Sequence, residues 1–180
     1  PIGFLGAVTT YNFLAGFNGL ETGQGIILLS SLAIVTFLTG NSWLSLIALC
    51  MVAALIAFYT FNKYPAKVFP GDVLTYAVGA MVAMIAILGN IEKIAIFFFI
   101  PYFLELLLKS RGRLKKHSFG KPNKDGSLDQ PYDKIYGLEH LAIAILKKIK
   151  PSKKVYEREV TWLIHGFQIV VIAVGFLIFF

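Results

Sequence analysis

The stretch FNKYPAKVFPGDVLTYAVGAMVAMIAILG, residues 61–89, places one acid, Asp72, at the start of an apolar run that is long enough to enter a bilayer. Ionisable residues at membrane segments are costly, and by default they mark candidate functional sites. Because Asp72 follows Pro70 and Gly71, it can also open a helix as the N-cap or a first-turn residue. The stretch therefore predicts a membrane helix that begins with an acid. It leaves open whether that acid only caps the helix or also binds a ligand.

The composition of the whole chain is that of a membrane protein. The 180 residues are 57% hydrophobic with a mean hydropathy of +0.71, whereas a soluble domain is about 45–50% apolar. Apolar runs predict the end of a helix at 1–11 and full spans at 24–40, 43–61, 72–89, 93–109 and 160–180. We therefore predict an all-α fold, a polytopic transmembrane helical bundle in a lipid bilayer. The single cysteine, Cys50, excludes an intrachain disulfide framework.

Positive charge is concentrated in residues 110–159. This segment holds 13 of the 17 Lys and Arg residues and six of the 10 acids, so it carries the whole formal charge of +7. Because Lys and Arg favour the cytoplasmic side of a membrane, the segment is predicted to be cytoplasmic. Counting spans then puts the loops 12–23 and 62–71 on the same face. The chain thus divides into helices with polar loops at 1–109, a basic loop at 110–159 and a final helix at 160–180.

The basic loop has two parts. Residues 110–133 are rich in Gly, Pro, Asp and Lys, and they predict turns or a short hairpin around Lys124, Asp125 and Gly126. Residues 134–150 have apolar residues at helical spacing and lysines at the C-terminal end, which is typical of an amphipathic helix at a membrane surface. Membrane topology and attraction to anionic lipids are an alternative explanation of the lysines.

Two groups of residues in the short loops are candidates for chemistry. Asn12 and Asn18 lie among several glycines, and amide groups can bind a hard cation, a phosphate or a nucleobase. The same residue types also build ordinary turns. In the second group, the carboxylate of Asp72 suits Mg²⁺, and Phe69 can either stack on a base or anchor the chain at the membrane interface.

A third group is cationic and lies in the basic loop. It includes Lys116 and His117, with Asn123 a few residues later. A cationic loop beside a carboxylate that can hold a metal ion is what diphosphate recognition needs. The chain has no GxxxxGK[ST], HExxH, CxxC or GxSxG motif. Basic charge without interleaved aromatic residues on a soluble face also argues against nucleic-acid binding.

The same groups carry a family resemblance. The matching stretches are NFLAGFNGLETGQ at 12–24, NKYPAKVFPGD at 62–72 and KKHSFGKPN at 115–123. They resemble the polyprenyl-phosphate N-acetylhexosamine-1-phosphate transferases, and more narrowly the eukaryotic and archaeal branch that uses UDP-GlcNAc and dolichyl phosphate. The order and spacing of the spans also agree, so the resemblance covers most of the chain. Residues 134–180 match in character alone.

The resemblance implies a reaction, its partners and its place. GlcNAc-1-phosphate would pass from UDP-GlcNAc to dolichyl or another polyprenyl phosphate with release of UMP, as the first step of lipid-linked oligosaccharide assembly for N-glycosylation. The site would lie on the cytoplasmic face of an archaeal plasma membrane or of the endoplasmic reticulum. The resemblance also implies a Mg²⁺ cofactor, with Mn²⁺ as an alternative, a homodimer, and no nucleic-acid partner.

The resemblance also assigns roles to residues at matching positions. Asn12 and Asp72 would hold the metal ion, and Asp72 and His117 would be the catalytic residues. The residues that would bind substrate are Asn18, Phe69, Lys116, His117 and Asn123. Within that set, the aromatic ring would stack on the uracil, and the two residues at 116 and 117 would contact the diphosphate and the sugar. Loops 12–23 and 62–71 would then be active-site loops, and 110–159 a substrate-binding loop.

The chain departs from the family pattern in one respect. The family carries paired aspartates on an earlier cytoplasmic loop, and this chain has no Asp-Asp. We expect those acids and part of the lipid groove to precede Pro1, so that the 180 residues alone are inactive. Two other functions stay open. The chain could belong to a transporter or flippase in which Asp72 serves a coupling ion, or to a catalytically inactive membrane subunit that binds a partner through 110–159.

Overall fold

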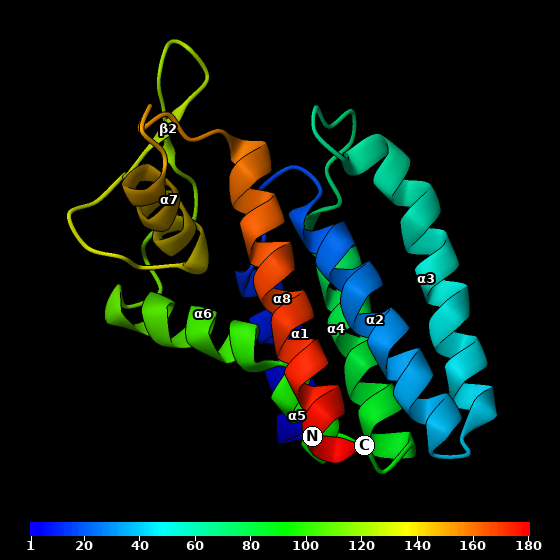
Figure 1. Cartoon of the computed structure of the whole chain (residues 1–180). Helices are drawn as coiled ribbons and strands as arrows, with labels where there is room; N and C mark the ends of the chain where they lie inside the picture. The colour runs from blue at the N-terminus through cyan, green and yellow to red at the C-terminus, as the bar shows by residue number, and fades with distance from the viewer.

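Helix α2 lies at the centre of the fold and packs against α3, α4 and α8 (Figure 1). The computed structural model describes residues 1–180. In chain order the elements are α1 (Ile2–Phe13), α2 (Leu20–Leu38), α3 (Ser42–Asn62), α4 (Gly71–Leu88), α5 (Glu92–Phe98), α6 (Ile100–Arg111), β1 (Lys121–Pro122), β2 (Leu128–Asp129), α7 (Leu138–Ile149) and α8 (Glu157–Phe179). The predicted helix at residues 1–11 is therefore α1.

Four helices, α2, α3, α4 and α8, are long and apolar enough to cross a membrane. In α2, 72% of the most apolar window is buried inside the protein, against 28% in α3. The exposed surface of α3 carries large apolar side chains, including Trp43, Leu46 and Ile56. Such a surface is a liability in water but suits hydrocarbon, where lipid tails are as apolar as leucine. The prediction of an all-α membrane bundle is confirmed, and the protein is an integral membrane protein.

One predicted span is wrong. Residues 93–109 do not form one helix, because α5 ends at Phe98 and α6 begins at Ile100, with Pro101 in the first turn of α6. Proline has no N–H to donate to the carbonyl of Phe97 four residues earlier, and its ring collides with that carbonyl. The helix therefore breaks at this point. After the break, α6 leads sideways away from α8 and runs below α7 instead of continuing alongside α8 (Figure 1).

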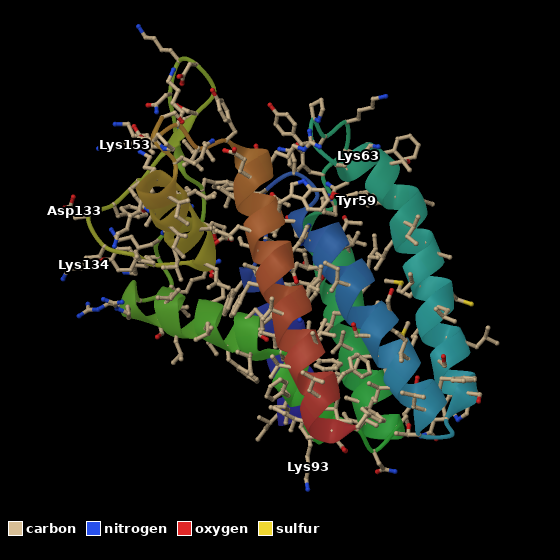
Figure 2. All side chains as sticks on the ribbon, in the orientation of Figure 1. Tyr59, Lys63, Lys93, Asp133, Lys134 and Lys153 are labelled. Atoms are coloured by element: carbon tan, nitrogen blue, oxygen red, sulfur yellow. The ribbon has the colours of Figure 1, made fainter.

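The polar loops gather at one end of the bundle. In Figure 1 the α1–α2 loop, the α3–α4 loop and the hairpin lie toward the top, whereas the α2–α3 and α4–α5 turns lie at the bottom. Figure 2 shows Tyr59 and Lys63 at the upper end and Lys93 at the lower end. The three groups of candidate residues therefore come from loops on the same side of the spanning helices.

The basic loop forms the predicted hairpin and the predicted helix. Strands β1 and β2 pair antiparallel, with Lys121 opposite Asp129, and Gly126 in the turn has a φ of +78° that favours glycine. Helix α7 is shorter than the predicted 134–150, because the chain is still extended at Gly137. The inner face of α7 packs into the protein against α6 and α8. Its exposed residues all lie in the C-terminal half.

Close packing of α1 against α4 depends on Gly79. A Cβ added at this residue would lie 2.7 Å from the Cα of Val8 and 2.9 Å from the carbonyl oxygen of Ala7. Both are backbone atoms of α1, so neither can move aside without shifting the helix. Since no side chain separates the two backbones, the last residues of α1 meet the first turn of α4.

We expect Gly79→Ala to lower the thermal stability of the full-length protein, meaning this chain with any residues that its gene encodes before or after it. The added methyl group must separate two backbones, and overpacking of this kind costs about 1–3 kcal/mol. Thermal unfolding in detergent measures the change. Gly166→Ala is the matched control, because a Cβ at Gly166 in α8 meets nothing within 4 Å. A G79A variant as stable as G166A would contradict the packing.

Candidate active site at the loop end of the bundle

The structure places Asn12 against the start of α4, the helix that carries Asp72 in its first turn. Asn12 is near the end of α1, and Asp72 lies in the first turn of α4. The hydroxyl of Thr75 donates to Asn12 Oδ1 at 2.7 Å and lies 3.2 Å from the carbonyl oxygen of Asp72. The Asn12 amide also reaches the hydroxyl of Tyr76 at 3.5 Å. Two residues that are 60 positions apart in sequence thus share one end of the α1–α4 contact.

Asn18 joins the two short loops to the start of α8. Its Oδ1 accepts the backbone N–H of Ala66 at 2.7 Å. Its backbone N–H donates to Glu157 Oε1 at 2.6 Å, and its Nδ2 donates to the same oxygen at 2.5 Å. Part of the hydrogen-bonding capacity of this amide is therefore used within the protein, and one N–H and one lone pair remain for a ligand.

The loop before α4 exposes Phe69 at the surface and is held in place by the buried side chain of Asn62. The ring of Phe69 is 61% exposed. Asn62 is fully buried, donates from Nδ2 to the carbonyl of Val68 at 3.0 Å, and accepts the hydroxyl of Thr22 at 2.7 Å. An aromatic ring exposed on a tethered loop is available to stack on a ligand.

The segment that carries Lys116 and His117 packs against the Asn12–Asn18 loop through aromatic rings. The rings of Phe119 and Phe17 have centroids 6.4 Å apart, and Gly16, with a φ of +124°, leaves room for the Phe119 ring. Lys116 Nζ lies 4.6 Å from the ring centroid of Tyr132, whose hydroxyl also accepts the backbone N–H of His117 at 3.4 Å. His117 itself is exposed. The segment that carries both candidates therefore borders the Asn12–Asn18 loop.

Asn123 is placed elsewhere. Its backbone N–H donates to the carbonyl of Ser127 at 2.8 Å, and its Nδ2 donates to the hydroxyl of the same serine at 3.1 Å. These bonds close the turn of the hairpin, which projects away from the bundle (Figure 1). The structure therefore gives Asn123 a structural role in the turn and does not bring it to the other candidates.

A group of buried charges lies behind the first loop. Glu105 of α6 and Glu139 of α7 are fully buried, and a Cβ added at Gly137 would lie 3.1 Å and 2.8 Å from their respective carboxylate oxygens. Lys109 is the neighbouring cation. Its Nζ lies 3.4 Å from Glu105 and donates to the carbonyl of Phe13. Lys109 therefore ties α6 to the end of α1.

Burial raises the pKa of the Glu139 carboxyl well above its usual range, and the nearby Glu105 carboxylate raises that pKa further. The folded protein then holds a proton at Glu139 that the unfolded chain releases once the pH exceeds about 4.3. Stability is therefore lost progressively as the pH rises above that value. We expect the uncharged E139Q variant to unfold at a higher temperature than wild type at pH 8, by at least about 2 °C.

The pH dependence is the decisive part of this comparison. The difference between E139Q and wild type should shrink as the pH falls from 8 to 5, because the pH then approaches the value at which the unfolded chain also keeps the proton of Glu139. Glu92→Gln changes an exposed acid in the first turn of α5 in the same way and should shift the unfolding temperature little at either pH. A lower unfolding temperature for E139Q at pH 8 would show that the carboxylate is ionised and stabilising.

The arrangement of Asn12 and Asp72 fits a hard divalent cation. The Asp72 carboxylate is exposed and takes part in none of the four ion pairs of the structure. Asn12 Oδ1 accepts one hydrogen bond and keeps a second lone pair. No group of three or more His, Cys, Asp or Glu side chains that could hold a metal ion occurs in the structure. A site with one carboxylate and one amide leaves positions for water and substrate phosphates, as Mg²⁺ sites usually do.

Sequence reasoning missed Thr75, Lys109 and Glu157. Thr75 is one turn after Asp72 in an apolar helix, which is the only local signal that it faces a polar partner. The residues around Glu157 in the sequence indicate only that it is an acid in the first turn of a helix. Neither its partner, Asn18, nor the Phe13 carbonyl that accepts from Lys109 can be read from nearby residues, because both contacts join distant parts of the chain.

Together the fold and the site define a helical membrane protein with a polar site built from loops at one end of the bundle. The chain belongs to glycosyl transferase family 4, whose family model matches residues 1–90. It is 43% identical over 135 residues to a Saccharolobus solfataricus protein named as a UDP-N-acetylglucosamine–dolichyl-phosphate N-acetylglucosaminephosphotransferase, covering 74% of this chain and 42% of that protein. The chain thus spans less than half the length of this relative.

Two further relatives mark the breadth of the family. A Methanocaldococcus jannaschii protein named as a glycosyltransferase is 39% identical over 160 residues, which are 87% of this chain and 52% of that protein. The phospho-N-acetylmuramoyl-pentapeptide-transferase of Staphylococcus carnosus is 38% identical over 106 residues, or 59% of this chain and 32% of that protein. The similarity therefore extends to transferases of both archaea and bacteria.

Proposed function

We propose that the full-length protein transfers GlcNAc-1-phosphate from UDP-GlcNAc to dolichyl phosphate, or a related polyprenyl phosphate, and releases UMP. The observation that carries the proposal is the meeting of the Asn12–Asp72 pair with the loops of Phe69 and of Lys116 and His117 at one end of a membrane bundle. These residue types are the ones that a nucleoside diphosphate and a divalent cation require. The names of the archaeal relatives agree with it.

The position of the site suits an acceptor that is held in the membrane. A polyprenyl tail keeps its phosphate at headgroup depth, so the reacting atoms must meet near the ends of the spanning helices. An apolar groove of about 330 Å³ runs between α1, α4, α5 and α6, and it includes Thr10, two residues before Asn12. Such a groove suits a lipid tail whose phosphate lies beside Asn12. The charge of 110–159 favours the cytoplasmic face for this end.

The reaction needs positioning and charge neutralisation more than proton transfer. An oxygen of the lipid phosphate forms a bond to the β-phosphorus of UDP-GlcNAc, the bond from that phosphorus to the α–β bridging oxygen breaks, and UMP leaves with the bridging oxygen. Asn12 and Asp72 would hold Mg²⁺, or Mn²⁺ in its place, which when bound neutralises charge on the diphosphate. Lys116 and His117 would bind the diphosphate, and Phe69 would stack on uracil.

Release of UMP tests the proposal directly. The full-length protein is given UDP-GlcNAc, dolichyl phosphate and Mg²⁺, and UMP is measured with and without chelator. We expect release that depends on both the metal and the lipid phosphate. No release with any UDP-sugar would overturn the proposal and favour a transporter or an inactive subunit.

Light scattering of the same preparation tests the homodimer that we propose from the family resemblance.

A further inference from the structure

The geometry points to Glu157 as a positioning residue for the nucleotide site, an inference that rests on the proposed function. Glu157 is the first residue of α8 and lies 139 positions after Asn18. We propose that its carboxylate fixes the orientation of the Asn18 amide, and through Asn18 the position of the loop that carries Phe69. Glu157 itself need not touch the substrate.

The contacts leave the Asn18 amide with one favourable orientation. Glu157 Oε1 accepts both the backbone N–H and Nδ2 of Asn18, at 2.6 Å and 2.5 Å. On the other side of the amide, Oδ1 accepts the backbone N–H of Ala66 at 2.7 Å. Rotating the amide by half a turn would place its oxygen against the carboxylate and its NH₂ group against an N–H. Both contacts would then be repulsive, so the two partners together set the orientation.

A fixed amide orientation has a consequence for base recognition. The amide keeps one N–H and one lone pair free, and these form a donor–acceptor pair. Uracil presents a carbonyl acceptor at position 4 beside its N3–H donor, whereas cytosine presents an amino donor beside a ring-nitrogen acceptor. For a base held in one pose, an amide that cannot rotate pairs with only one of these patterns. Glu157 would therefore contribute to the choice of uridine over cytidine nucleotides.

The same contact extends to the loop of Phe69. Ala66, which donates to Asn18, is three residues before Phe69, and Asn62 holds the carbonyl of Val68 from the other side. Two side chains thus hold the loop, in addition to backbone bonds from Lys67 and Val68 to the Phe61 carbonyl, and the bond to Asn18 depends on Glu157. Removing the carboxylate would loosen the loop at Ala66 while leaving the Asn62 contact in place.

Glu159 provides a matched control within the same helical turn. It is also an acid in the first turn of α8 and is also partly exposed. Its carboxylate pairs with Lys150 at 2.7 Å and accepts the backbone N–H of Tyr156 at 2.9 Å, and it does not contact Asn18. Both acids share the favourable interaction with the helix N-terminus. The pair therefore separates the contact with Asn18 from the general effect of charge at this position.

The test compares E157A, E157Q and E159A in the full-length protein. We expect E157A to raise KM for UDP-GlcNAc by about tenfold, the loss typical of one hydrogen bond to a charged group, with kcat changed little. In competition experiments, the ratio of the Kd for CDP to the Kd for UDP should be smaller in E157A than in wild type. E157Q keeps an oxygen acceptor and should recover part of the affinity. E159A should match wild type in each of these measurements.

A second measurement does not depend on turnover. Hydrogen exchange of peptides that cover residues 63–70 should be faster in E157A than in wild type and unchanged in E159A. Equal exchange and equal KM in E157A and E159A would overturn the role of Glu157. Absence of UMP release by the wild-type protein would refute the proposed function, and the exchange comparison would still decide whether Glu157 holds the loop.

Discussion

Replacing Asp72 by Asn in the full-length protein is expected to lower the rate of UMP release by about 10²–10³-fold. Asn has nearly the same shape as Asp but lacks the negative charge that holds a divalent cation against substrate phosphates. Because Asp72 is exposed and forms no ion pair, its replacement should leave folding intact. The loss should be accompanied by weaker dependence of the residual rate on Mg²⁺ concentration.

Asp133→Asn is the control for this substitution. Asp133 is also exposed, undergoes the same chemical change, and lies at the outer edge of the basic loop, away from the α1–α4 contact (Figure 2). We expect D133N to retain wild-type activity. If D72N also retained it, the metal role of Asp72 would be refuted and Asp72 would be left as an acid in the first turn of α4. A loss of ion-coupled transport in D72N would instead support the transporter alternative.

Replacing Phe69 by Ala is expected to raise KM for UDP-GlcNAc by about tenfold or more, because stacking of a base on an aromatic ring contributes about 1–3 kcal/mol. The ring is 61% exposed, so its removal sacrifices little packing within the protein. Thermal stability should therefore stay close to that of wild type. Phe69→Trp should keep most of the affinity, since any flat aromatic ring can stack on uracil.

Phe61→Ala is the matched control for the aromatic ring. Phe61 is 53% exposed near the end of α3 and close in sequence to the same loop, and its backbone carbonyl, which the substitution keeps, accepts from Lys67 and Val68. F61A should leave KM unchanged. A KM for F69A equal to that of F61A would show that Phe69 is an interfacial anchor and not part of the nucleotide site.

Local patterns in the sequence were sufficient for most of the fold. Apolar length alone predicted α2, α3, α4 and α8, because a chain that enters hydrocarbon must satisfy its backbone hydrogen bonds within helices. Turn chemistry around Gly126 predicted the hairpin. The continuous span at 93–109 was wrong because hydropathy outweighed Pro101, although the proline was a visible local signal for a break.

For the candidate site, the sequence indicated the possible ligand-binding residues but not the residues that hold them in place. The residue types at Asn12, Phe69 and Asp72 suit a metal ion and a nucleotide, and the family resemblance selected these roles over a turn, an interfacial anchor and a helix cap. The residues that hold them in place, Thr75 and Glu157, carry no such signal. A glutamate is common in the first turn of any helix, and a threonine inside a helix often bonds to a carbonyl of the preceding turn, so these residue types do not distinguish a positioning role from an ordinary one.

The amino-acid sequence by itself determined four helices that are long and apolar enough to cross a membrane, the loop that carries the positive charge and, through the family resemblance, the candidate side chains for a diphosphate site. Those properties depend on residue type and short-range periodicity. Only the tertiary structure decided that Asn12 meets Thr75, that Glu157 holds Asn18, and that Asn123 stays in the hairpin turn. The first two pairings join residues that are 63 and 139 positions apart. They follow from the close approach of whole helices, which no local pattern encodes.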